Sequence, residues 1–114
     1  MDKSLLEQIE TEFPYIKPYE EEDLEWWNEG LDYIESGNLN EAEKKFKMLT
    51  LSQPDHSDGF EGLSKVYTKM NRIEEAKFFI NIAYEKAQGS VRSGNTDSVL
   101  LKAILEQKER IELL

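Results

Sequence analysis

Apolar residues recur at helical spacing through most of the chain, and their pattern repeats after 34 residues, the separation of Glu41-Ala42 from Glu75-Ala76. Further pairs at the same offset are Trp26 and Phe60, Tyr33 and Tyr67, Gly37 and Asn71, Leu39 and Ile73, Phe46 and Ile80, and Leu49 and Ala83. An interval of this length is typical of one helix-turn-helix unit in a helical repeat protein. The sequence therefore predicts two tandem helical hairpins.

Each hairpin is expected to contain two helices with one apolar face each. The first helices carry Trp26, Gly30 and Tyr33, and then Phe60, Leu63, Ser64 and Tyr67. The second helices carry Ala42, Phe46 and Leu49, and then Ala76, Ile80 and Ala83. Spacings of three and four residues place these positions on one side of a helix, and the small alanines allow two helices to approach closely.

Turn-forming residues separate the expected helices. Gly37 and Asn71 tolerate a positive φ, which a helix needs just past its C-terminus when the chain turns back sharply. We expect Asn40 to cap the helix that follows, with Glu43 three residues later completing a capping-box-like pattern. Pro54 marks the boundary between the two units.

Residues 1–22 precede the repeats and divide into two parts. A short amphipathic helix is predicted from the near-helical spacing of Leu5, Leu6, Ile9 and Phe13. Pro14 ends this helix, and residues 13–19, with two prolines and several aromatic side chains, are expected to form an extended segment along the repeats. The carboxylates of residues 20–23 suit the N-terminal end of the first repeat helix.

The C-terminal part is expected to cover the last repeat. Residues 89–96 have the composition of a turn or linker, and Asp97-Ser98 is expected to begin a final helix. The apolar stripe of this helix consists of Leu100, Ala103, Ile104, Ile111 and Leu114. A repeat array needs such a terminal helix to cover its last apolar face. Alternatively, Leu101 and Leu105, which widen the stripe, belong to an interface with a second molecule.

Composition disfavours several classes of partner. The 114 residues are enough for one domain and carry a formal net charge of −10, from 24 acidic and 14 basic residues. The resulting field repels nucleic acids and anionic membranes. The chain has no cysteine, no apolar run long enough to span a bilayer and no signal-peptide pattern, so we expect a cytoplasmic location.

The residues that can carry chemistry do not form a recognisable catalytic pattern. His56, the single histidine, is flanked by Asp55 and Asp58, and a metal or acid–base site can be built from this triplet. However, one histidine is a poor ligand set, and aspartate and serine at a junction are ordinary helix caps. The serines lack a base at a recognisable spacing, and the glycines form no phosphate-binding loop. We therefore expect no catalysis, no bound metal and no cofactor.

These residues together resemble the tetratricopeptide repeat family. Its signature positions in the first unit are occupied by Trp26, Gly30, Tyr33, Ala42, Phe46 and Pro54. The resemblance covers about residues 23–90 and implies an all-α fold, a short solenoid of helical hairpins in an α-α superhelix. The implied divisions of this single domain are an N-terminal segment (1–22), repeat 1 (23–56), repeat 2 (57–90) and a capping helix (97–114). Glu29, where the family usually has leucine, and Gln88, where the second repeat would have proline, depart from the pattern.

In this family the first helices of the repeats form a concave groove. Carried onto this chain, the groove positions are Leu24, Trp27, Leu31, Ile34 and Glu35, and then Asp58, Glu61, Lys65, Thr68 and Lys69. The candidate partner-binding residues among them are Trp27, Leu31, Ile34, Lys65 and Lys69. A competing interpretation is that the N-terminal segment covers the apolar half of this groove. Members that hold the C-terminal carboxylate of heat-shock chaperones use a lysine and an asparagine where this chain has Trp27 and Leu31.

The resemblance implies a non-catalytic adaptor or scaffold that binds a peptide or helix of another protein in the groove. The alternative is a structural module whose groove or last helix mediates self-association into a homodimer or a larger assembly. The initial Met1 and the flanking segments lead us to expect a whole small protein rather than an excised domain.

Overall fold

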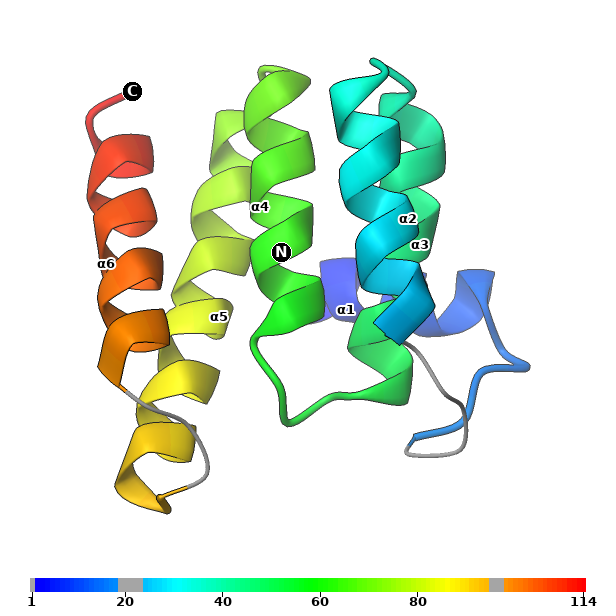
Figure 1. Cartoon of the computed structure of the whole chain (residues 1–114). Coiled ribbons are helices and arrows are strands. Elements are labelled where there is room, and N and C mark those ends of the chain that lie inside the picture. The colour runs from blue at the N-terminus through cyan, green and yellow to red at the C-terminus, as the bar shows by residue number, and fades with distance from the viewer. Residues whose placement is uncertain (1, 19–23, 95–97) are drawn as a thin grey trace.

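The computed structural model of the chain describes residues 2–18, 24–94 and 98–114. Its helices are α1 (Asp2–Glu12), α2 (Leu24–Glu35), α3 (Leu39–Ser52), α4 (Asp58–Lys69), α5 (Ile73–Arg92) and α6 (Ser98–Glu112). The described ranges contain no strand. The all-helical class predicted from the sequence is therefore confirmed (Figure 1).

Within the described ranges, the helices that follow α1 form two layers. α2, α4 and α6 stand side by side in one layer, and α3 and α5 form the layer behind them (Figure 1). Consecutive helices from α2 to α6 pack against one another, and α2 also contacts α4. α1 contacts α3 and lies on the side of the second layer. The layer of α2, α4 and α6 is consequently not covered by α1.

The two hairpins turn with the same backbone geometry. Gly37 has a φ of 83° and Asn71 has a φ of 61°. In each turn the amide one residue further donates a 2.8 Å hydrogen bond to the carbonyl of Tyr33 or Tyr67. This bond closes a helix when the residue past its C-terminus adopts the left-handed conformation. The turns predicted at Gly37 and Asn71 are confirmed.

The core runs between the two layers. Its largest fully buried side chains include Phe46, Phe79, Leu63, Ile80 and Ile104. Phe46 lies at the junction of the hairpins, with Gly30 of α2 and Gly62 of α4 against its ring. A Cβ at either glycine would overlap that ring. The missing side chains therefore allow α2 and α4 to approach α3 closely.

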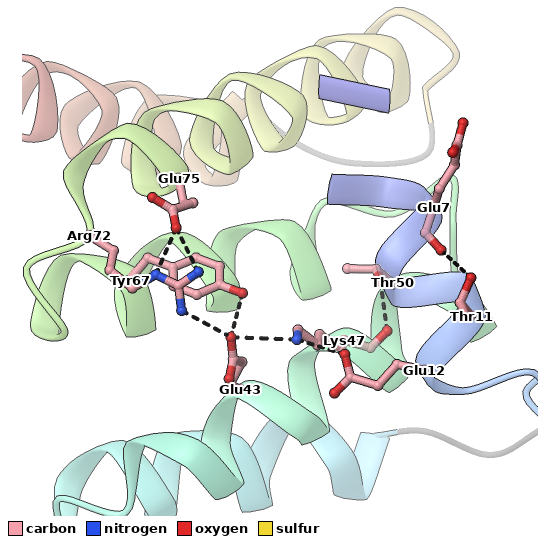
Figure 2. Close-up of polar contacts among 9 residues, drawn as sticks. All are labelled: Glu7, Thr11, Glu12, Glu43, Lys47, Thr50, Tyr67, Arg72 and Glu75. Atoms are coloured by element: carbon pink, nitrogen blue, oxygen red, sulfur yellow. Dashed lines mark hydrogen bonds and ion pairs between the residues drawn. The ribbon is translucent and has the colours of Figure 1, made fainter. Parts of the chain in front are cut away.

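A polar network joins the hairpins near the same junction (Figure 2). Tyr67 of α4 donates a 2.5 Å hydrogen bond to Glu43 of α3, and the guanidinium of Arg72 lies 4.6 Å from the centroid of the Tyr67 ring. Glu43 also pairs with Lys47 at 3.5 Å and with Arg72 at 3.7 Å, and Arg72 pairs with Glu75 at 2.6 Å. Burial and the Glu43 carboxylate raise the pKa of Tyr67 well above its ordinary value. The hydroxyl therefore stays a hydrogen-bond donor.

The N-terminal helix α1 is present as predicted and is anchored near its C-terminal end. Ile9 and Phe13 are buried. Glu12 pairs with Lys47 of α3 at 3.0 Å, which connects α1 to the polar network (Figure 2). Both apolar burial and one ion pair therefore hold α1 against the second layer.

The segment over residues 13–18 lies beside α3, where Ile16 and Pro18 share a hollow with Leu51, but its predicted extended start is wrong. Pro14 and Tyr15 form a turn, in which the Ile16 amide donates to the Phe13 carbonyl at 3.2 Å. Proline favours such a turn because its ring fixes φ. The last residue of that predicted segment, Tyr19, and the carboxylates of residues 20–23 lie outside the described residues.

The predicted cap of the second repeat helix is also wrong. α3 begins at Leu39, so Asn40 lies inside its first turn, and Asn38 precedes the helix without a side-chain cap. Glu43 does not complete a capping box, because its carboxylate accepts the hydrogen bond of Tyr67 instead. Glu43, which the local sequence pattern assigned to the cap of α3, therefore binds Tyr67 of α4 instead.

The predicted linker over residues 89–96 begins too early. α5 continues to Arg92, and Gly94, with a φ of 80°, follows its end. A single helical glycine at position 89 lowers helix propensity by only about 1 kcal/mol. Packing of α6 against α5 supports the longer helix. Residues 95–97, including the predicted helix start at Asp97, lie outside the described residues.

α6 packs against α5 as the predicted terminal helix, but its buried stripe differs. Ile104 and Ile111 are buried as predicted, whereas Ala103 is exposed and Leu114 is 67% exposed. Leu114 lies past the end of the helix, and Ala103 lies at the margin of the buried face, one turn before Gln107. Gln107, which the apolar pattern omitted, is buried between Ile104 and Ile111.

Candidate functional site

A surface hollow of about 480 Å³ lies on the layer of α2, α4 and α6. Its lining comes from all three helices and the end of the chain: Ile34, Lys65, Thr68, Lys69, Gln107, Arg110, Ile111 and Leu114. We call this set the groove. It lies where three neighbouring helices stand side by side in one layer (Figure 1).

The groove combines positive charge with apolar surface. Its cations are Lys65, Lys69 and Arg110, and none of its lining residues is acidic. Ile34 is half-buried and Ile111 is buried, while Leu114 is largely exposed. Such a surface can hold a ligand by burying apolar area and by pairing with negative charge.

The Lys65 side chain makes polar contacts within the protein. Its Nζ donates to Oε1 of Gln107 on α6 at 3.1 Å and lies 3.8 Å from the Glu61 carboxylate. Gln107 Nε2 donates to Ser64 Oγ at 2.7 Å. The amide of Gln107 is therefore satisfied on both sides by α4, which fixes α6 beside the groove.

Glu61 lies beneath this edge of the groove as a buried carboxylate. Burial raises the pKa of Glu61 above its ordinary value of 4.5, and the charge of Asp58 adds to the increase. Lys65 opposes both effects by its charge and hydrogen bond. The groove position that sequence analysis assigned to Glu61 is therefore inside the protein rather than in the hollow.

Three of the five candidate residues predicted from the sequence line the groove. These are Ile34, Lys65 and Lys69. Trp27 and Leu31 do not line it. The Trp27 ring meets Phe46 edge-on, with centroids 5.6 Å apart, and Leu31 is half-buried against the core. Because the helix has no side chain at Gly30, the Phe46 ring extends far enough to contact Trp27.

The α6 side of the groove was missed by sequence reasoning. Ile111 and Leu114 were placed on a covering stripe, and neither they nor Arg110 were assigned to a binding surface. The available signal was the spacing of three and four residues that links Ile104, Gln107, Ile111 and Leu114. That spacing predicts that the four side chains lie on one face of the helix. It does not predict which other helices pack against that face.

The described part of the N-terminal segment does not line the groove. Leu6, Ile9, Ile16 and Pro18 instead border a hollow of about 390 Å³ on the α3 and α5 side. Thr50, Leu51, Pro54, Phe60, Lys86 and Glu10 complete its lining. Residues 2–18 therefore leave the groove uncovered.

The described residues hold no group of three or more His, Cys, Asp or Glu side chains that could bind a metal ion. His56 and Asp55 are exposed between α3 and α4. No helix in the described ranges is long and apolar enough to cross a membrane.

No protein-family model, no curated protein and no solved structure matches this chain. The groove's own geometry and chemistry are therefore the basis for a functional proposal.

Proposed function

We propose that this chain is a non-catalytic protein-interaction module of the tetratricopeptide type, which binds a peptide or helix of another protein in the groove. The observation that carries the proposal is the groove itself, where three cations and three apolar side chains line one hollow on three parallel helices. Interface energy concentrates where apolar anchors and a few polar groups meet. The cytoplasm is the proposed compartment, because the chain contains no cysteine.

The repeat architecture supports the proposal. The hairpins repeat at 34 residues in sequence, and their turns share the same hydrogen bond from the amide after Gly37 or Asn71. The second hairpin is followed by α6, which stands beside α4 as α4 stands beside α2. Such stacking creates extended binding surfaces along the first helices of the units.

Two neighbouring leucines provide a matched test. Leu114 lines the groove and Leu113 does not, although both are exposed at the end of the chain. Peptides selected from a random phage-displayed library on the unchanged protein would be measured by fluorescence polarisation against Leu114→Ala, Ile34→Ala and Leu113→Ala. We expect about a tenfold loss of affinity for the first two variants and little change for Leu113→Ala. Equal binding to all three, or no selected peptide, would contradict the proposal.

Self-association is the second candidate, and exposed apolar side chains favour it. Val99 is 71% exposed and Leu113 is 87% exposed, both on or next to α6. Leu101 and Leu105, on the same helix, are half-buried. Sedimentation of the protein over a wide concentration range distinguishes the two candidates. A mass that rises with concentration and falls back after Val99→Ser and Leu113→Ser would support the structural role.

A further inference from the structure

The groove differs in charge from other hollows of the protein. No acidic residue lines it, although acidic residues outnumber basic ones by 24 to 14 in the chain. Three other hollows each include at least one glutamate: Glu10 in one, Glu7 and Glu12 in the next, and Glu43 in the last. In the last of these, Lys47 and Arg72 are already paired with glutamates. The lining of the groove thus contains three basic side chains and no acidic side chain.

The groove cations are not equivalent. Lys65 is held by Gln107 and lies near Glu61, so it positions α6. Lys69 and Arg110 are exposed, and neither makes an ion pair with a residue in the described ranges. They come from α4 and α6 and face the same hollow. These two side chains are therefore the ones available to an incoming negative group.

Apolar surface accompanies this pair of cations. Ile111 lies one residue from Arg110 along α6, and Leu114 lies one helical turn further. A polyanion such as a nucleic acid carries many charges, so a chain of net charge −10 repels it far more than it repels a short peptide with a few carboxylates. A peptide that carries both carboxylates and an apolar side chain gains from both parts of the groove.

We infer that the groove takes an acidic peptide segment that also presents an apolar side chain, and this inference rests on the proposed function. Carboxylates of the segment pair with Lys69 and Arg110. Its apolar side chain covers the exposed side chain of Leu114. The bidentate fork of Arg110 gives direction to the contact, while Lys69 acts as a point charge.

Competition among peptides tests this charge preference directly. Three phage-displayed pools share the same leucine, isoleucine and phenylalanine positions, and the remaining positions are acidic, amide or basic. On the full, unchanged chain we expect the acidic pool to be enriched about tenfold or more over the amide pool. Added salt should reduce the advantage, because exposed charges are screened.

The variants separate the roles of the cations. Lys69→Gln with Arg110→Gln should remove the advantage of the acidic pool without changing the melting temperature, since both side chains are exposed. Lys102→Gln with Arg92→Gln removes the same charge from exposed positions outside the groove and should keep the advantage. Lys65→Gln should lower the melting temperature, because Gln107 loses its partner.

The outcomes distinguish the inference from the function on which it rests. Enrichment of the amide or basic pool, with binding that still falls after Leu114→Ala, overturns the charge preference and leaves the peptide-binding groove intact. The charge preference is also overturned if both double variants lose the acidic pool equally. If binding of no pool depends on Leu114, the proposed function itself fails.

Discussion

The two hairpins share their turns and their helix spacing, yet their first helices are buried to very different extents. In α4 most residues from Gly59 to Tyr67 are buried, whereas in α2 the described apolar side chains are only half-buried. α4 packs against α3, α5 and α2, while α2 packs mainly against α3 and less extensively against α4. Equivalent patterns thus give different burial, because the neighbours of a repeat helix decide what its apolar face covers.

In the first hairpin, an ion pair between α2 and α3 occupies a position where the second hairpin has apolar packing. Glu29, where the resembled family usually has leucine, pairs with Lys45 of α3 at 3.5 Å. A partly exposed pair of this kind contributes little stability, within about 1 kcal/mol. It does avoid an exposed leucine on this side of the hairpin. The equivalent position in the second hairpin is Leu63, which is fully buried.

Removal of the Phe46 side chain should weaken the packing between the two hairpins and give the largest loss of stability among these predictions. Phe46 fills the space against Gly30, Gly62 and Trp27, so one side chain serves α2, α3 and α4. We expect Phe46→Ala to lower the free energy of unfolding by about 3–5 kcal/mol in urea titrations followed by circular dichroism. Met48→Ala, at a half-buried position on the same helix, is the control. A similar loss in that variant would show that Phe46 is not the central contact.

A proline at position 88 should shorten α5, so that the second hairpin would end at the position equivalent to the end of the first. Pro54 follows the end of α3, a helix of 14 residues, whereas Gln88 lies inside α5, a helix of 20 residues. We expect Gln88→Pro to cost about 3 kcal/mol or more and to reduce helical circular dichroism, because proline removes a hydrogen bond and clashes with the preceding turn. Gln88→Ala should leave both unchanged or improved. If proline were tolerated, the last turns of α5 would not contribute to stability.

The matched tyrosines of the two hairpins allow the polar network to be tested. Tyr67 donates to Glu43, but the equivalent Tyr33 hydroxyl makes no hydrogen bond with a residue in the described ranges. We expect Tyr67→Phe to lower the free energy of unfolding by about 1.5–3 kcal/mol, since a hydrogen bond to a charged group is lost. Tyr33→Phe should change it by less than about 0.5 kcal/mol. Equal effects of the two substitutions would argue that Glu43 is satisfied without the hydroxyl.

Much of the fold could be predicted from local sequence. The repeat at 34 residues indicated the helices, and Gly37 and Asn71 marked the turns, because positive φ at a helix end has few solutions. The length of α5 was not predicted, although Gln88 replaces the proline that would end the second helix of a repeat. Glycine at position 89 suggested a break, yet packing against α6 outweighs its propensity.

The candidate groove could be predicted only in part. The resemblance to tetratricopeptide repeats placed Lys65 and Lys69 in the groove, but the position of Trp27 depends on the Phe46 ring, which packs against two glycines and reaches Trp27. Gln107 was omitted because polar residues do not enter an apolar stripe. Its partner Ser64 lies 43 residues away, so no local pattern could reveal the bond. Contacts between distant helices set these features.

The smallest expected change in stability concerns one repeat position, which is aromatic in the first hairpin and acidic in the second. Trp27 of the first unit corresponds to Glu61 of the second. Burial raises the pKa of Glu61 above 4.5, so the folded protein binds this proton more readily than the unfolded chain does. Ionisation of Glu61 therefore lowers stability as the pH rises through the folded-state pKa. Below about pH 4.5, where both states are protonated, this loss is absent.

Glu61→Gln removes this ionisation while keeping size and polarity. We expect the variant to be more stable than the unchanged protein at pH 7, by no more than about 1 kcal/mol because Lys65 loses a partner. The difference should shrink as the pH falls toward 4.5 in melting curves recorded from pH 4 to 8. Asp32→Asn, at an exposed position on α2, supplies the control. A Glu61 difference that is independent of pH, or that grows in acid, would show that Lys65 rather than burial governs this carboxylate.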